Sequence, residues 1–65
     1  MLHLEPNKVY SLQITFPDSA NTVTEVAIGS KVETAIKDAK NKYPTFRRIV
    51  VYDADTGDVV SWIKN

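Results

Sequence analysis

Apolar and polar side chains alternate near the start of the chain, in the stretch K-V-Y-S-L-Q-I-T-F over residues 8–16. A period of two is typical of a half-buried β-strand, because successive side chains point to opposite faces. The next residues, P-D-S-A-N, are typical of a turn, since Pro17 fixes φ while Asp18 and Asn21 can bond their own backbone. The stretch T-V-T-E-V-A-I over 22–28 is β-branched and more polar, which suits an edge strand. The first 28 residues therefore predict a β-hairpin.

The apolar period changes to that of a helix after Gly29. One stripe at helical spacing consists of Val32, Ala35, Ile36, Ala39 and Tyr43. Ser30 is the expected N-cap, with Glu33 completing a capping box, and Pro44 should end the helix at Tyr43. The opposite side carries two acid-before-base pairs at i, i+4, Glu33 with Lys37 and Asp38 with Lys42.

The last third of the chain contains Y-D-A-D-T-G-D-V-V-S-W over 52–62, which combines three aspartates with a glycine. A calcium loop of the EF-hand type needs glycine at position 6 and glutamate at position 12. Counted from Asp53, however, Gly57 is at position 5 and Lys64 is at position 12. A turn over 54–57 with Gly57 in the left-handed region explains the stretch better. We therefore predict a second hairpin and no metal site. Its expected cross-strand pairs are Ala54 with Asp58, Tyr52 with Val60, Val50 with Trp62, and Ile49 with Ile63.

The elements together predict one α+β domain over residues 1–65, in the order ββαββ, with a four-stranded sheet of two hairpins and one helix on one face. This order resembles the β-grasp architecture of small immunoglobulin-binding domains and ubiquitin-like proteins. The resemblance covers element order only and implies no function. A ubiquitin-type modifier would end in two glycines, whereas this chain ends Lys64-Asn65. The β-grasp strand order 2-1-4-3 puts the third strand at an edge, while 2-1-3-4 places the apolar run 49–52 centrally; the sequence leaves both open.

Composition narrows the chemistry that is available. The chain has 65 residues and no cysteine, and its one histidine is His3. Thiolate metal sites and disulfides are therefore absent, and histidine-based acid–base catalysis lacks a well-placed proton shuttle. With no phosphate-binding glycine motif and little volume for an enclosed pocket, we expect a protein that is not an enzyme and has no cofactor. The longest apolar runs are far too short to span a membrane, no secretion signal opens the chain, and a cytoplasmic location is expected.

Charge is zero overall, with eight basic and eight acidic residues, but it is unevenly spread. Residues 31–48 carry a balance of +4, and the segments on either side each carry −2. The basic residues that are candidate nucleic-acid contacts are Lys37, Lys40, Lys42, Arg47 and Arg48. A solvated helix surface is the plainer explanation for the lysines, because the domain lacks the basic excess of most nucleic-acid binders.

The second hairpin is apolar on both faces, although one helix can cover only one face of the sheet. One face has Val50, Tyr52, Val60 and Trp62, flanked by Arg48; the other has Ile49, Val51, Val59 and Ile63. The sequence does not decide which set lies under the helix, and the uncovered set should be an interaction surface. We expect a non-catalytic protein-interaction module or small inhibitor that uses the first set or the hairpin edge. The alternative is a nucleic-acid binder that uses the basic residues and an exposed aromatic, and a homodimer is compatible with both.

Overall fold

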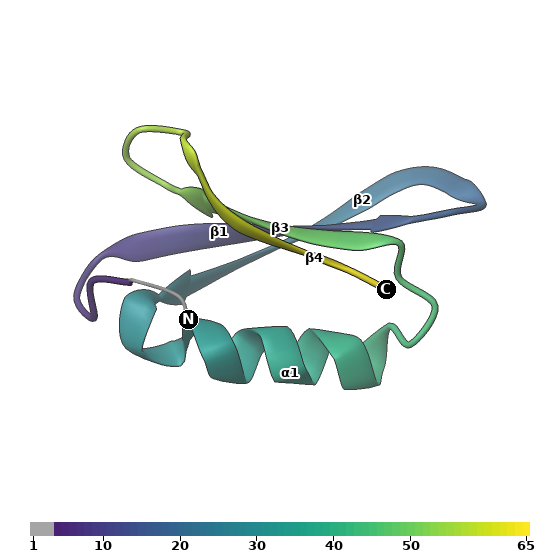
Figure 1. Cartoon of the computed structure of the whole chain (residues 1–65), viewed down its shortest axis with the longest axis horizontal. Helices are drawn as coiled ribbons and strands as arrows, with labels where there is room; N and C mark the ends of the chain where they lie inside the picture. Colours follow the sequence, from purple (N-terminus) through teal and green to yellow (C-terminus); the bar gives the residue numbers. More distant parts are fainter. Residues whose placement is uncertain (1–3) are drawn as a thin grey trace.

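A computed structural model describes residues 4–65, so that His3 lies outside the described part of the chain. The predicted order of hairpin, helix and hairpin is confirmed (Figure 1). The elements are β1 (Val9–Phe16), β2 (Ser19–Ile28), a short 3₁₀ turn η1 (Gly29–Lys31), α1 (Val32–Lys42), β3 (Arg48–Asp53) and β4 (Val59–Lys64). All four strands form one sheet, and α1 lies against one side of it (Figure 1).

The strand order is β2-β1-β3-β4, with every neighbouring pair antiparallel. This order decides between the two alternatives in favour of 2-1-3-4, and the β-grasp order 2-1-4-3 does not apply. The reason lies in the composition of β3, whose Ile49 and Val51 are fully buried. A strand of this kind gains most from a central position, where backbone groups on both sides are paired and helix and sheet enclose its inner side chains.

The core lies between the helix and the inner face of the sheet, which we define as the face turned toward α1. Leu12 is paired with Val51 and Ile14 with Ile49 across the β1–β3 ladder, and all four are fully buried. The helical stripe is confirmed, since Val32, Ile36 and Ala39 complete this core. Phe16 and Tyr43 close one end with an edge-to-face contact of 5.6 Å between ring centroids.

The start of the helix differs from the prediction. Gly29–Lys31 forms a 3₁₀ turn, the N-cap of α1 is Lys31, and no side chain caps the helix. The Ser30 capping box is therefore wrong. Ser30 lies inside the helical turn, where its amide donates to the Pro6 carbonyl at 3.2 Å, so the N-terminal segment supplies the acceptor that a cap would have provided.

The expected helix ion pairs are also wrong. In the described part of the chain, carboxylates lie within ion-pair distance of only one cationic side chain, that of Lys8. Such exposed i, i+4 pairs gain only about 0.3–0.5 kcal/mol, which is too little to fix two long side chains. The predicted end of the helix is confirmed, with Tyr43 as the C-cap after Lys42.

Gly29 is the point where the N-terminal segment crosses the chain. A Cβ atom built on Gly29 would lie 1.9 Å from the Glu5 carbonyl oxygen and 2.7 Å from its carbon. The Gly29 amide also donates to the Lys8 carbonyl at 2.8 Å. Only glycine fits so close an approach between two backbones.

The second hairpin confirms Gly57 in the left-handed region, with φ of 77°. The Gly57 amide donates to the Asp53 carbonyl at 2.8 Å, and the Asp53 amide donates to the Asp58 carbonyl at 2.9 Å. Val50 faces Trp62 and Ile49 faces Ile63 as expected, but Tyr52 pairs with Val59, not Val60, because the register shifts there by one residue. The bulge makes Val59 and Val60 oppose Tyr52 together. Our placement of Val59 on the same face as Ile49 is therefore wrong.

Candidate functional site

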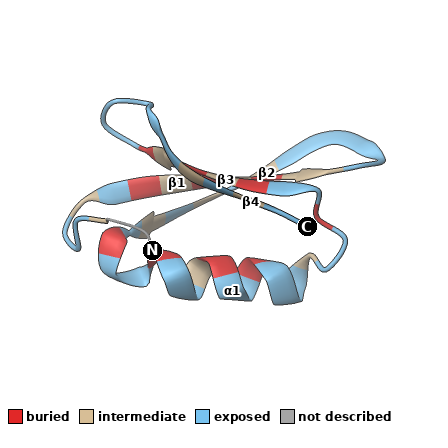
Figure 2. Ribbon diagram, viewed as in Figure 1, coloured by how far each residue is buried: buried red, intermediate tan, exposed pale blue. Residues whose placement is uncertain are grey.

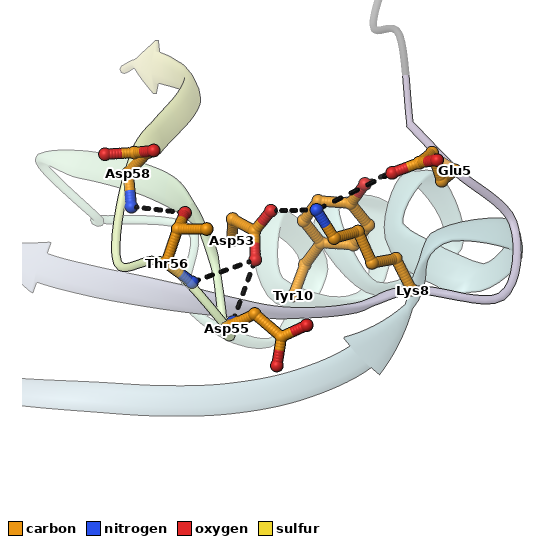
Figure 3. Close-up of polar contacts among 7 residues, drawn as sticks. All are labelled: Glu5, Lys8, Tyr10, Asp53, Asp55, Thr56 and Asp58. Atoms are coloured by element: carbon orange, nitrogen blue, oxygen red, sulfur yellow. Dashed lines mark hydrogen bonds and ion pairs between the residues drawn. The ribbon is translucent and has the colours of Figure 1, made fainter.

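A polar cluster joins the N-terminal segment to the second hairpin (Figure 3). The Lys8 Nζ donates to the Asp53 carboxylate at 2.5 Å and lies 3.6 Å from the Glu5 carboxylate. The other Asp53 oxygen, Oδ1, accepts the backbone amides of Asp55 at 2.8 Å and Thr56 at 3.3 Å. Beside this cluster, the Tyr10 hydroxyl accepts the Glu5 amide at 3.0 Å.

These contacts hold both charged groups in their ionised forms. The hydrogen bond from Lys8 lowers the pKa of Asp53 below its ordinary value, and the turn amides act in the same direction. The bond to Asp53 raises the pKa of Lys8 above its ordinary value. Both shifts move away from neutrality, whereas a general acid or base needs a pKa near the working pH. The hydrogen bonds of the cluster therefore fix the turn of the second hairpin.

Asp53 differs from the sequence-based expectation. An aspartate beside a hairpin turn is expected to be exposed, but the Asp53 residue is only 8% exposed. Its partner Lys8 is 45 positions away in the sequence, so no local pattern reveals the contact. Within residues 4–65, no three histidine, cysteine, aspartate or glutamate side chains converge in a way that could hold a metal ion.

The strongest candidate site is the sheet face that α1 leaves uncovered, which we call the outer face. In the described chain six large hydrophobic residues are exposed, and the register places all of them on this face: Val9, Val26, Ile28, Val59, Val60 and Trp62. Trp62 is 57% exposed and Val26 is 67% exposed. Val50 and Tyr52 lie half-buried in the same surface, and Figure 2 shows the run of exposed positions along β2 and β4.

The first predicted surface set lies together on this face. Val50 pairs with Trp62, Tyr52 pairs with the Val59–Val60 bulge, and Arg48 begins the same row of β3. The Arg48 guanidinium carbon lies 5.2 Å from the Trp62 ring centroid, which is cation–π geometry. The pair therefore presents a planar cation over one face of an aromatic ring.

The apolar surface is larger than the sequence indicated, because it continues onto β2 through Val26 and Ile28. We expected the patch to be confined to the second hairpin. Val26 and Ile28 alternate with Ala27 and Glu25, and this period-two pattern was the available signal. The polar residues in the first half of the stretch 22–28 obscure this signal.

The predicted basic residues do not form one surface. Arg48 belongs to the outer face, whereas Lys37, Lys40 and Lys42 are exposed on α1, which lies against the opposite side of the sheet (Figures 1 and 2). The Lys42 Nζ lies 5.5 Å from the ring centroid of Tyr43. Arg47 is also exposed and has its amide bonded to the Thr15 carbonyl at 2.7 Å. The sheet thus separates the helix lysines from the Arg48–Trp62 pair.

A groove of about 280 Å³ opens between the end of α1 and β4. Its lining residues are Lys40, Pro44, Phe46, Ile63, Lys64 and Asn65. The Asn65 side-chain amide donates to the Pro44 carbonyl at 3.1 Å and to the Phe46 carbonyl at 2.7 Å, which fixes the connector between α1 and β3. The groove is therefore built on an ordered floor and contains two lysines and no carboxylate side chain.

No protein-family model, curated protein or solved structure matches this chain. In the described part, α1 is too short and too polar to cross a membrane.

Proposed function

We propose that this protein is a non-catalytic binding module, an interaction protein or small inhibitor, which contacts a protein partner through the outer face of the sheet and its β4 edge. The observation that carries the proposal is the gathering of all six exposed large hydrophobic residues of residues 4–65 on one face. Exposed apolar residues that gather on one face of a protein often mark an interaction site, whereas those scattered singly do not.

The composition of the outer face supports a protein partner. Tryptophan, tyrosine and arginine are enriched where protein interfaces gain most of their binding energy, and Trp62, Tyr52 and Arg48 lie together here. The strand positions that face outward include no aspartate or glutamate. An apolar surface with charge only at one end suits the buried centre and polar rim of an interface.

Nucleic-acid binding is the competing function, and Arg48 beside Trp62 is the observation that favours it. An aromatic ring with an adjacent arginine can stack a base and hold a phosphate. The helix lysines, however, lie on the other side of the sheet. A single-stranded nucleic acid that stacks on Trp62 would therefore make few phosphate contacts with them. Nucleic-acid binding is therefore the second candidate function.

The test locates the binding surface with charge-matched variants. Binders are selected from a random-peptide display library against the immobilised protein, and their affinities are measured for two double variants. Val59→Glu with Trp62→Glu alters the outer face, and Thr34→Glu with Asn41→Glu adds the same charge at exposed positions of α1. Binders should lose tenfold or more in affinity for the outer-face variant only. Equal affinity for both variants would contradict the proposal, provided that urea unfolding shows both to be folded.

Oligonucleotide titration addresses the competing function. Trp62 emission is followed while single- and double-stranded DNA and RNA are added at about 50 and 200 mM salt, because phosphate contacts weaken steeply over this range. We expect no saturable change in emission. A saturable change whose affinity falls steeply with salt would replace protein binding with nucleic-acid binding.

A further inference from the structure

We propose that the partner segment is an extended acidic peptide that adds to the sheet as a fifth strand along β4; this inference rests on the proposed function and specifies its ligand. Strand addition to a sheet edge combines main-chain hydrogen bonds with pockets for alternate side chains. The β4 edge offers both requirements in the described structure.

The backbone of β4 has unpaired groups on its free side. The Asn65 amide donates to the Arg47 carbonyl at 3.1 Å, which makes Arg47 and Asn65 a hydrogen-bonded pair of the β3–β4 ladder. Such pairs alternate in an antiparallel ladder, so Ile63 and Ser61 also direct their backbone groups toward β3. The N–H and C=O groups of Trp62 and Lys64 consequently point away from the sheet, where another strand can pair with them.

Side chains of an added strand would alternate between two different surfaces. Those on one side would lie beside Val60 and Trp62 on the outer face, and those on the other would lie over the groove of about 280 Å³. The first surface is apolar and favours β-branched residues. The second contains Lys40 and favours carboxylates, while Lys64, which is opposite Arg48 in the ladder, adds positive charge at that end of β4.

Charge complementarity identifies the peptide as acidic. Within residues 4–65, the carboxylates form ion pairs only with Lys8, so neither Lys40 nor Lys64 has a carboxylate of its own chain within 4.0 Å. Arg48 lies beside the same end of β4, opposite Lys64 in the ladder. Acidic residues of the peptide should therefore be placed at the Lys64 end, since Asp55 and Asp58 at the hairpin tip would repel them at the other.

The other sheet edge is a poorer acceptor for this ligand. On β2, Glu25 is paired with Leu12 and therefore belongs to the side of the edge that faces the helix layer. An inward-pointing charge is a common device against edge pairing, and a carboxylate there opposes an acidic strand directly. The two edges thus differ in charge as well as in the presence of the groove.

The test uses a capped heptapeptide of alternating glutamate and valine as the probe. Its binding is followed by ¹⁵N–¹H NMR and amide exchange on the full chain. We expect saturable shifts along β4 and slower exchange of the Trp62 and Lys64 amides. A lysine–valine peptide, and a glutamate–valine peptide with proline at its centre, should bind at least tenfold more weakly, because the first has the wrong charge and the second lacks a backbone donor.

Variants of the groove provide the matched comparison. Lys40→Glu and Lys64→Glu should each reduce affinity about tenfold, equivalent to about 1.4 kcal/mol. Lys37→Glu, at an exposed helix position that does not line the groove, should leave affinity unchanged. Equal losses in all three variants would show long-range charge attraction only and would overturn the groove assignment.

The remaining outcomes separate this inference from the proposed function. Absence of any shift up to about 1 mM peptide, or protection of β2 amides in place of β4 amides, overturns the inference. If display-selected binders still depend on Val59 and Trp62, the proposed function survives with a different ligand. If those binders ignore the outer face, the proposed function is wrong, whatever the peptide does.

Discussion

Of the two glycine-to-alanine substitutions that the chain allows, the one at Gly29 should destabilise this protein more. The new Cβ would lie 1.9 Å from the Glu5 carbonyl oxygen, whereas real Cβ contacts are essentially never closer than 3.0 Å. The N-terminal segment must therefore move by more than 1 Å. Both neighbouring atoms belong to the backbone, so no side-chain rotation can relieve the clash.

The size of the effect follows from overpacking and lost hydrogen bonds. Overpacking of a tight site costs about 1–3 kcal/mol. Displacing the segment also strains the bonds from the Gly29 amide to the Lys8 carbonyl and from the Ser30 amide to the Pro6 carbonyl, each worth about 1 kcal/mol. A domain of this length has a total stability of only about 3–10 kcal/mol. We therefore expect Gly29→Ala to lower the free energy of unfolding by about 3 kcal/mol.

Gly57 provides the matched control, because its constraint is conformational and not steric. Its φ is 77°, but a Cβ there would meet nothing within 4 Å. Gly57→Ala should cost about 1–2 kcal/mol for the left-handed backbone, and Gly57→Asn should cost less, since asparagine tolerates that region. Urea unfolding followed by Trp62 emission and circular dichroism measures all three. A Gly29→Ala midpoint equal to that of the unmodified protein would refute the close approach of Glu5.

Three further predictions concern the ion pair, the core and the helix start. The pKa of Asp53 is lowered, so the contribution of the Lys8–Asp53 pair to stability is complete above about pH 4 and is lost as pH falls through the pKa of Asp53 in the folded protein. The pKa of Lys8 is raised, so the same contribution is also lost as pH rises above about 10 and passes the pKa of Lys8 in the folded protein. The thermal unfolding temperature should fall as the pH is lowered below about 4, and Asp53→Asn should make this fall smaller. A fall of the same size in the variant would exclude the ion pair as its cause. Leu12→Ala should cost about 2–5 kcal/mol in urea unfolding, because the side chain is fully buried, and a cost below 1 kcal/mol would mean that the core is not packed as described. Ser30→Ala should change stability by less than about 0.5 kcal/mol, whereas a true N-cap would lose about 1 kcal/mol.

The order of the elements could be predicted because each one has a local signal. The alternation over 8–16, the apolar stripe over 32–43 and the glycine at 57 all describe what neighbouring residues do. Strand order could not be settled in this way, because pairing of β1 with β3 depends on contacts between distant segments. The capping box failed for the same reason, since the backbone acceptor that replaces it comes from Pro6.

The predicted surface residues were a sound guide to the second hairpin but not to the whole face. Arg48, Val50, Tyr52, Val60 and Trp62 do lie together, because the period of two places them so. The one-residue bulge that adds Val59 has no clear sequence signal. Nor could the groove be foreseen, because it is formed where the end of the helix meets a strand that follows it in the sequence.

The position of β1 beside β3 has a consequence for how the chain folds. Each hairpin can close locally, but their shared ladder joins residues at least 33 positions apart, as between Thr15 and Arg48. Closing such a loop loses more chain entropy than closing a turn of four residues, and the additional free-energy cost is about 2 kcal/mol. We therefore expect this ladder to form last. Until the β1–β3 ladder forms, Leu12 and Val51 lie on separate hairpins and are not paired. The second hairpin of one chain can then dock on the first hairpin of another chain. A refolding rate that depends on protein concentration would reveal this exchange, with the connector over residues 43–47 as its hinge.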